Sequence, residues 1–260
     1  MKPLIAPLVL VALLLATNAR ALADNTGFLY AYALHDSHAS DAFYSVEALK
    51  PLGPDYPVRP YLEMRLQRDS RDASSVLPQT LNDNYGLIAG GMQYQGRAGL
   101  RVFAQIGAAF AFGPQTPAGW NLKRSDFRGG LQLYRNWNDL INNPRRAIGS
   151  FFGSAVYYGR YENEIFFAEA ERGREFGALE HPVQVYTRVS AAADTRGYFY
   201  NNSVNLTLGA RVMPLGHLGP SLALEESYNR FVGPIERVSA DGLTRDYLSF
   251  RPVLTFGTSF

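Results

Sequence analysis

The sequence predicts an antiparallel transmembrane β-barrel of about 10–12 strands in the outer membrane of a Gram-negative bacterium. Three observations support this fold class. The amino terminus has the features of a signal peptide, several segments alternate apolar with polar side chains, and one of these segments ends the chain at Phe260. The expected organisation is a signal peptide at 1–23 followed by a barrel at 24–260.

The amino-terminal segment is typical of an export signal. Lys2 supplies positive charge, an apolar run extends from Leu4 to Ala16, and Ala21-Leu22-Ala23 provides small residues around a cleavage point. The run is too short for a comfortable transmembrane helix. The chain has no cysteine, so lipid attachment at a mature amino-terminal cysteine is excluded.

The composition of the remaining chain excludes several protein classes. Without Lys2 and Arg20, the 25 basic residues become 23, equal to the 23 acidic ones, so bulk charge gives no indication of nucleic-acid binding. The absence of cysteine excludes a disulfide framework. No apolar run of helix-spanning length follows the leader, which excludes an inner-membrane helical protein. A periplasmic or secreted all-β protein and an outer-membrane barrel remain.

Alternation along the strands favours the barrel. In the last segment, Leu248, Phe250 and Leu254 alternate with Ser249 and Arg251. Similar alternation occurs at 58–67, 100–110, 183–190 and 203–212. A soluble β-sandwich also alternates, but its strands usually have about 5–6 residues, whereas a tilted membrane strand needs about 9–11. An Arg or Lys on the lipid face would cost roughly 2–4 kcal/mol, and these five apolar faces carry neither.

Twelve candidate strands follow from the pattern. They are 27–34, 42–50, 58–68, 85–95, 99–112, 126–137, 149–161, 164–175, 183–194, 199–213, 219–231 and 245–260. Residues 40–49 are equally compatible with a capped helix, which would leave ten strands. With both termini in the periplasm, the polar stretches 69–84, 113–125 and 232–244 are expected on the cell exterior, where longer loops belong.

The polar faces of these strands are rich in arginine. Eight arginines are expected to face the lumen: Arg59, Arg65, Arg101, Arg128, Arg160, Arg188, Arg211 and Arg251. Only Glu63, Glu169 and Glu225 are expected to oppose them on the same faces. Arginine presents a planar fork that suits carboxylates and phosphates. Two interpretations follow: arginines and glutamates tie strands together inside a closed barrel, or the arginines form a basic track for an anionic chain such as an acidic polysaccharide.

Three short motifs resemble a known group of proteins. They are 125–137 (SDFRGGLQLYRNW), 157–161 (YYGRY) and 170–176 (AERGREF). They resemble the C-terminal barrels of outer-membrane exopolysaccharide-export porins and of the related phage-adsorption protein A family. The resemblance covers about residues 85–260 and implies a barrel that conducts or displays surface glycan. In that group a periplasmic helical-repeat domain precedes the barrel, so such a domain is expected here from a separate partner. Outer-membrane lipid and lipopolysaccharide are the other expected partners.

The last strand departs from the general barrel-assembly signal. That pattern has a polar residue, a glycine two positions on, and hydrophobic residues three and five positions after the glycine. Aligned to Phe260, this chain has Val253, Thr255 and Thr258 at those positions, and Gly257 is displaced. The terminal aromatic residue is therefore kept while the strict signal is not.

Catalysis is the main alternative to a non-enzymatic barrel. His35-Asp36-Ser37 and His38-Ala39-Ser40 resemble the His-x-Ser of outer-membrane lipid A deacylases, but in those enzymes the pair lies on a late strand. Two histidines in a loop also make a poor closed metal site, so we predict neither a catalytic residue nor a metal or other cofactor. A third possibility is a structural or receptor barrel acting through its exterior loops.

Two glycine pairs are expected to have a structural role and not a binding role. Gly90-Gly91 and Gly129-Gly130 lie within candidate strands. At such positions a bulge or a close backbone approach is expected rather than a phosphate-binding loop.

Overall fold

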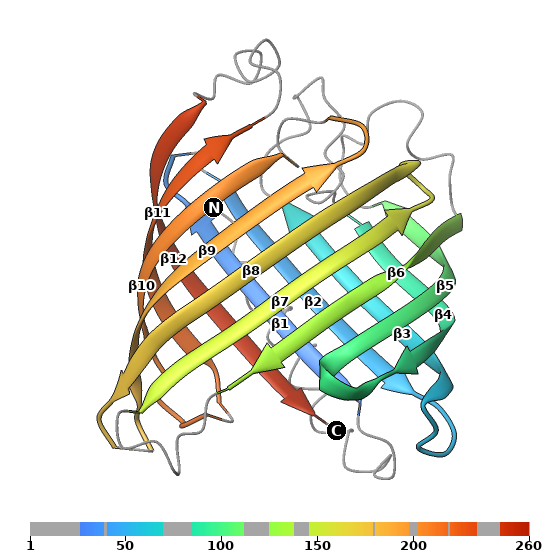
Figure 1. Cartoon of the computed structure of the whole chain (residues 1–260), viewed down its shortest axis with the longest axis horizontal. Coiled ribbons are helices and arrows are strands. Elements are labelled where there is room, and N and C mark those ends of the chain that lie inside the picture. The colour runs from blue at the N-terminus through green and yellow to red at the C-terminus, as the bar shows by residue number, and fades with distance from the viewer. Residues whose placement is uncertain are drawn as a thin grey trace.

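The computed structural model is a closed antiparallel β-barrel of twelve strands (Figure 1). It describes residues 27–38, 41–69, 85–111, 125–137, 146–178, 180–197, 202–217, 219–232 and 245–259. The strands are β1 (Phe28–Asp36), β2 (Asp41–Pro51), β3 (Val58–Asp69), β4 (Tyr85–Gln95), β5 (Leu100–Ala111), β6 (Ser125–Asn136), β7 (Ala147–Tyr158), β8 (Asn163–Phe176), β9 (Val183–Asp194), β10 (Ser203–Val212), β11 (Ser221–Phe231) and β12 (Asp246–Ser259). Consecutive strands are neighbours, and β1 pairs with β12 to close the sheet.

The structure confirms the larger of the two predicted strand counts. Residues 41–51 form strand β2, which pairs with β1 and β3, so the alternative of a helix at 40–49 was wrong. Pairing on both edges satisfies the backbone of β2 and outweighs a local helical preference. No described helix is long and apolar enough to cross a membrane. The predicted signal peptide at 1–23 and the terminal Phe260 lie outside the described residues.

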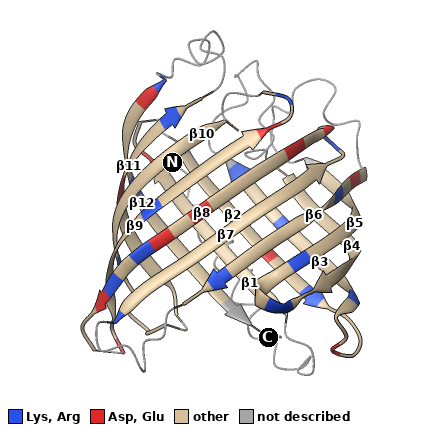
Figure 2. Cartoon of the chain, viewed as in Figure 1, with Lys and Arg blue, Asp and Glu red and all other residues tan. Residues whose placement is uncertain are grey.

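The outer surface of the barrel is apolar, as the alternation predicted. Outward-facing residues such as Ile106, Leu208 and Leu248 are exposed, whereas their inward-facing neighbours Gln105, Thr207 and Ser249 are buried. Paired residues on adjacent strands share a face, so this inside–outside division continues round the wall. Most of the strand ribbon in Figure 2 is tan, and the coloured segments that mark charged residues are frequent along β8.

The two rims of the barrel differ in the length of their connections. Phe28 pairs with Ser259, so β1 begins and β12 ends at the same rim, at the bottom of Figure 1. The three longest connections, 70–84, 112–124 and 232–245, all join strands at the opposite rim, whereas the longest connection at the first rim is 137–146. Short periplasmic turns and longer extracellular loops are the rule for such barrels. With its apolar outer wall and polar interior, this closed barrel is an outer-membrane protein.

Inward-facing glycines let large side chains lie against the wall. A Cβ on Gly91 would lie 2.9 Å from a ring carbon of Tyr61, and a Cβ on Gly130 would meet the β7 backbone at 2.2 Å. Register is continuous through both positions, so neither is a bulge. The predicted close backbone approach is therefore confirmed at these two glycines.

Candidate functional site: the lumen wall

Seven of the eight arginines assigned to the lumen lie at inward-facing strand positions, on β3, β5, β6, β9, β10 and β12. Arg160 does not lie on a strand, because β7 ends at Tyr158 and the turn to β8 follows. The prediction of a strand to 161 was wrong there. The Arg160 side chain is buried, with its guanidinium carbon 5.2 Å from the ring centres of both Tyr85 and Tyr161.

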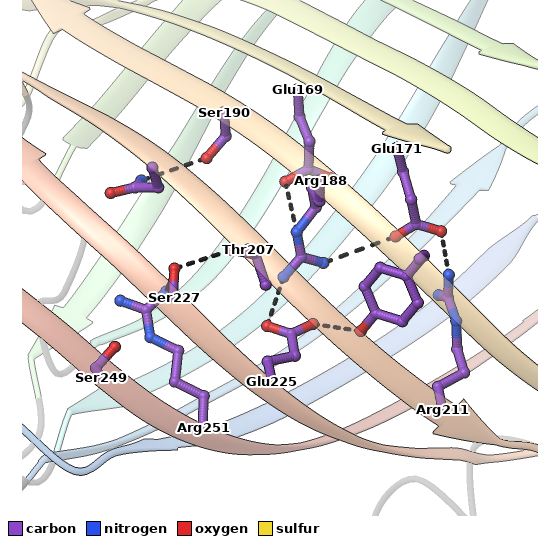
Figure 3. A network of polar contacts seen from close by, with 12 residues as sticks. Glu169, Glu171, Arg188, Ser190, Thr207, Arg211, Glu225, Ser227, Ser249 and Arg251 are labelled. Carbon is purple, nitrogen blue, oxygen red and sulfur yellow. Dashed lines mark hydrogen bonds and ion pairs between the residues drawn. The ribbon is translucent and has the colours of Figure 1, made fainter. Parts of the chain in front are cut away.

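One ion-pair network ties β8, β9 and β11 together (Figure 3). Arg188 of β9 contacts three carboxylates: Glu225 at 2.6 Å, Glu169 at 3.6 Å and Glu171 at 4.0 Å. The hydroxyl of Tyr186 donates a second hydrogen bond to Glu225, at 2.5 Å. Glu225 is 2% exposed, so its charge depends on these contacts for compensation.

The network continues to β10 through Arg211. This arginine forms an ion pair with Glu171, and its guanidinium carbon lies 4.3 Å from the centre of the Tyr186 ring. The ring lies over Gly209, whose Cβ, if present, would be 2.5 Å from it. Because Gly209 has no side chain, the Tyr186 ring can lie along the wall. Its face contacts Arg211 and its hydroxyl contacts Glu225.

Arg251 holds the closing seam of the barrel. It pairs with Asp36 of β1 at 2.9 Å and donates to Asn229 of β11 at 2.8 Å. It also donates to Ser227, which in turn contacts Thr207. A single side chain on β12 therefore connects the first strand to the last two.

The opposite half of the wall has its own ion pairs. Arg65 contacts Glu47 at 2.5 Å and Glu63 at 3.3 Å. Arg128 makes two hydrogen bonds to Asp126, at 2.8 and 3.0 Å, and both side chains are buried.

Arg128 and Arg59 also make hydrogen bonds that fix them against this half of the wall. Arg128 also donates to the hydroxyl of Tyr85 at 3.1 Å. Arg59 bonds to Asp55 of the β2–β3 connection at 2.8 Å and to Gln95 at 2.5 Å.

Arg101 differs from the other inward-facing strand arginines because no described carboxylate lies within ion-pair distance of it. Its Nε donates to Gln93 at 2.8 Å and its Nη1 donates to Gln132 at 2.9 Å. Its guanidinium carbon lies 4.9 Å from the Tyr61 ring centre and 4.6 Å from that of Phe103. The third nitrogen, Nη2, is buried and has no hydrogen-bond acceptor.

Unused donors lie around Arg101 as well. The side-chain amide nitrogens of Gln93 and Gln105 are buried without an acceptor. Arg101 Nε can only donate, so the oxygen of Gln93 must face it and the nitrogen must point elsewhere. Gln105 uses its oxygen to accept from the hydroxyl of Tyr61 at 2.5 Å. This part of the wall therefore offers donors with no matching acceptor among the described residues.

The lumen wall has no excess of arginine over carboxylate. Besides the three predicted glutamates, six more acids face inward in the structure. They are Asp36, Glu47, Asp126, Glu171, Glu175 and Asp194. The predicted bias toward positive charge was therefore wrong, because most of the arginines are neutralised by neighbours. Glu171 and Glu175 share the parity of Glu169, so the sequence pattern did contain a signal for them.

The lumen wall also has an apolar part. Leu49, Tyr61, Phe103 and Val156 form one buried cluster, against which Tyr158 packs. These residues come from β2, β3, β5 and β7, which are mostly not neighbours in the sheet. Contacts among them therefore brace this part of the barrel from inside.

The proposed histidine–serine pair is not assembled in the described residues. The hydroxyl oxygen of Ser37 accepts from the backbone N–H of Phe250 at 2.8 Å, and the His38 ring stacks on Tyr247 with centres 4.3 Å apart. No histidine nitrogen bonds to a serine hydroxyl within the described ranges 27–38 and 41–69. Asp36 is committed to Arg251.

No protein-family model matches the sequence, and a search of curated proteins finds no match. Among solved structures, the β domain of the Bordetella autotransporter BrkA is 12% identical, with a TM-score of 0.41 over 90% of this chain and 98% of that one. A bacterial polysaccharide outer membrane secretin is 8% identical (TM-score 0.41; 89% and 97%), and the NanC porin is 9% identical (0.40; 88% and 98%). Such low scores assign no family and no ligand to this chain.

Proposed function

We propose that this outer-membrane barrel assists the export or surface display of a polysaccharide, and that acidic groups of the glycan contact Arg101 in the lumen. The single observation that carries the proposal is the arginine itself. Arg101 faces inward, lacks a carboxylate partner among the described residues, and lies beside the unused amide donor of Gln93. Charge-assisted hydrogen bonds from guanidinium to carboxylate are about twice as strong as neutral ones.

The other lumen arginines have a different role in this proposal. Arg65, Arg128, Arg188 and Arg211 are held by carboxylates, so their charges stabilise the wall and are not available to a glycan. The basic track of the sequence interpretation is thereby reduced to one site on a charge-balanced wall. A periplasmic helical-repeat partner remains part of the proposal and rests on the motif resemblance.

Conductance through planar bilayers tests the proposal. Short oligogalacturonate is the probe, and a neutral oligosaccharide of the same length is its control. We expect Arg101→Gln to weaken block by the acidic probe about 10- to 150-fold, the loss expected for a hydrogen bond to a charged group. Arg230→Gln removes one charge from the outer surface and should leave block unchanged. A folded wild-type barrel with no conductance, together with a deletion strain that secretes normal glycan, would refute the proposal.

A second candidate is a structural or receptor barrel that acts through its exterior loops. The observation in its favour is the apolar cluster of Leu49, Tyr61, Phe103 and Val156, which braces the wall from within. Small barrels use such contacts to fill their interior. Replacing 69–84, 113–125 and 232–244 by short turns separates the two functions. If the loop-deleted barrel still conducts but its strain behaves like the deletion strain, the loops carry the function. If the strain secretes normal glycan, the lumen carries it.

A further inference from the structure

Four outward-facing residues form a basic, aromatic patch near the periplasmic rim. They are Arg135 at the end of β6, Trp137 directly after it, and Arg172 and Arg174 in the last third of β8; together we call them the Arg–Trp patch. All four are exposed. Basic segments are visible on the lower parts of β6 and β8 in Figure 2. These strands lie on either side of β7, so the patch covers three adjacent strands.

The strand register brings the members of the patch together. The backbone N–H of Trp137 donates to the carbonyl of Gly149 on β7, at 3.1 Å. Gly149 is in turn the pairing partner of Arg172 on β8. Trp137 and Arg172 therefore flank the same glycine, about 10 Å apart across two strand spacings. Arg135 pairs with Phe151, which lies two residues beyond Gly149 on β7, closer to the membrane centre.

Gly149 gives the patch its shape. A Cβ at this position would lie 2.1 Å from the indole nitrogen of Trp137. The ring can therefore lie flat across β7 only because Gly149 has no side chain. Gly149 itself is buried beneath the indole, which remains 57% exposed on its outer side.

Two arginines of the patch, Arg135 and Arg172, keep a positive charge on the outer wall that no described carboxylate neutralises. Arg135 and Arg172 form no ion pair with any described residue. Toward the membrane centre the neighbouring outward positions Phe151 and Ala170 are apolar, and the outward residue paired with Arg172 on β9 is Thr187. Glu175 lies on the inward face of β8, where it bonds to Gln184 and Arg146. Unpaired arginines on a lipid-facing wall are costly unless their heads reach the interface or a partner.

We propose that the Arg–Trp patch binds the phosphate of an anionic phospholipid in the periplasmic leaflet. Guanidinium forks suit phosphate oxygens, and tryptophan is enriched at the level of the lipid head groups. The apolar wall around Phe151 lies on the side of the patch that faces the membrane centre, where the acyl chains of the same lipid would run. A phospholipid therefore matches both parts of this surface, because its phosphate fits the arginines and its acyl chains fit the apolar wall.

Quenching of tryptophan fluorescence by brominated lipids tests this site directly. The chain has two tryptophans, so Trp120→Phe leaves Trp137 as the sole reporter. The protein is reconstituted in phosphatidylcholine nanodiscs containing increasing fractions of either brominated phosphatidylglycerol or brominated phosphatidylcholine. We expect half-maximal quenching at a lower fraction of phosphatidylglycerol. Arg135→Gln with Arg172→Gln should reduce this preference about fivefold per arginine.

Three controls keep the outcome interpretable. Arg135→Lys with Arg172→Lys keeps the charge and should retain most of the preference, which would show that the barrel tolerates substitution at these positions. Arg230→Gln, on the outer surface near the opposite rim and 3.6 Å from Asp246, should change nothing. Equal quenching by both lipids in the parent protein, or a preference that survives the double glutamine variant, would overturn the proposal. Loss of the preference in millimolar inorganic phosphate would overturn a lipid as the occupant.

Discussion

Removal of Arg188 is expected to be among the most damaging single changes in the lumen, because three carboxylates depend on it. In Arg188→Gln, Glu225 and Glu169 lose a cation, and Glu171 keeps only Arg211. Breaking a buried ion pair from one side costs about 3–5 kcal/mol. We expect the free energy of unfolding to fall by an amount in this range.

Removal of one carboxylate should cost less. In Glu225→Gln, Arg188 retains Glu169 at 3.6 Å and Glu171 at 4.0 Å, and the new amide oxygen can still accept from Tyr186. The loss is then that of one hydrogen bond to a charged group, about 1.5–3 kcal/mol. The double variant should lose less free energy of unfolding than the two single variants lose in sum. The difference should be at least about 1 kcal/mol, because the two side chains are in contact.

Urea unfolding of the barrel in phospholipid vesicles, followed by tryptophan fluorescence, measures these differences. Arg196→Gln is the matched control, because Arg196 pairs with Glu162 on the exposed surface, where both partners are more than 40% exposed. It should change the free energy by less than about 0.5 kcal/mol. If Arg188→Gln lowers the free energy of unfolding no more than Glu225→Gln does, the three carboxylates do not depend on Arg188 for their stability.

Two other predictions concern the wall itself. Gly209→Ala places a methyl group against the Tyr186 ring and should cost about 1–3 kcal/mol by the same unfolding assay; Gly257→Ala, whose Cβ would have 3.6 Å to its nearest neighbour, is the matched control and should be close to neutral. Ile106→Arg places a charge on an outward position that is 65% exposed and should cost about 2–4 kcal/mol in vesicles, whereas Ile106→Val should cost under 1.5 kcal/mol. An arginine variant as stable as the valine variant would show that residue 106 lies outside the hydrocarbon region.

Strand positions could be predicted because their signal is local. On β12, the alternation of Leu248 and Phe250 with Ser249 and Arg251 follows from the two-residue period of an extended chain. The same logic located the segments at 58–67 and 183–190. The helix alternative for 40–49 arose because that segment has apolar residues on both faces, so its local pattern was ambiguous until β1 and β3 paired with it.

The partners of charged side chains could not be predicted in this way. Arg251 pairs with Asp36, which is 215 positions away in the chain, and the contact exists only because β1 closes against β12. The pattern of residues 41–49 does not show that Glu47 faces the lumen, where it neutralises Arg65. A shift of one residue in register would move any of these side chains to the other face, so the net charge of the wall depends on register as well as on composition.

The sequence by itself determined the class of protein and the inward or outward direction of most strand arginines, since both depend on periodicity along one strand. Only the tertiary structure decided which arginines are neutralised, because an ion pair requires two strands in a fixed register. The register left Arg101 as the inward-facing strand arginine without a carboxylate partner among the described residues. It also brought Arg172 beside Trp137 on the outer surface, over a glycine that allows the indole to lie flat.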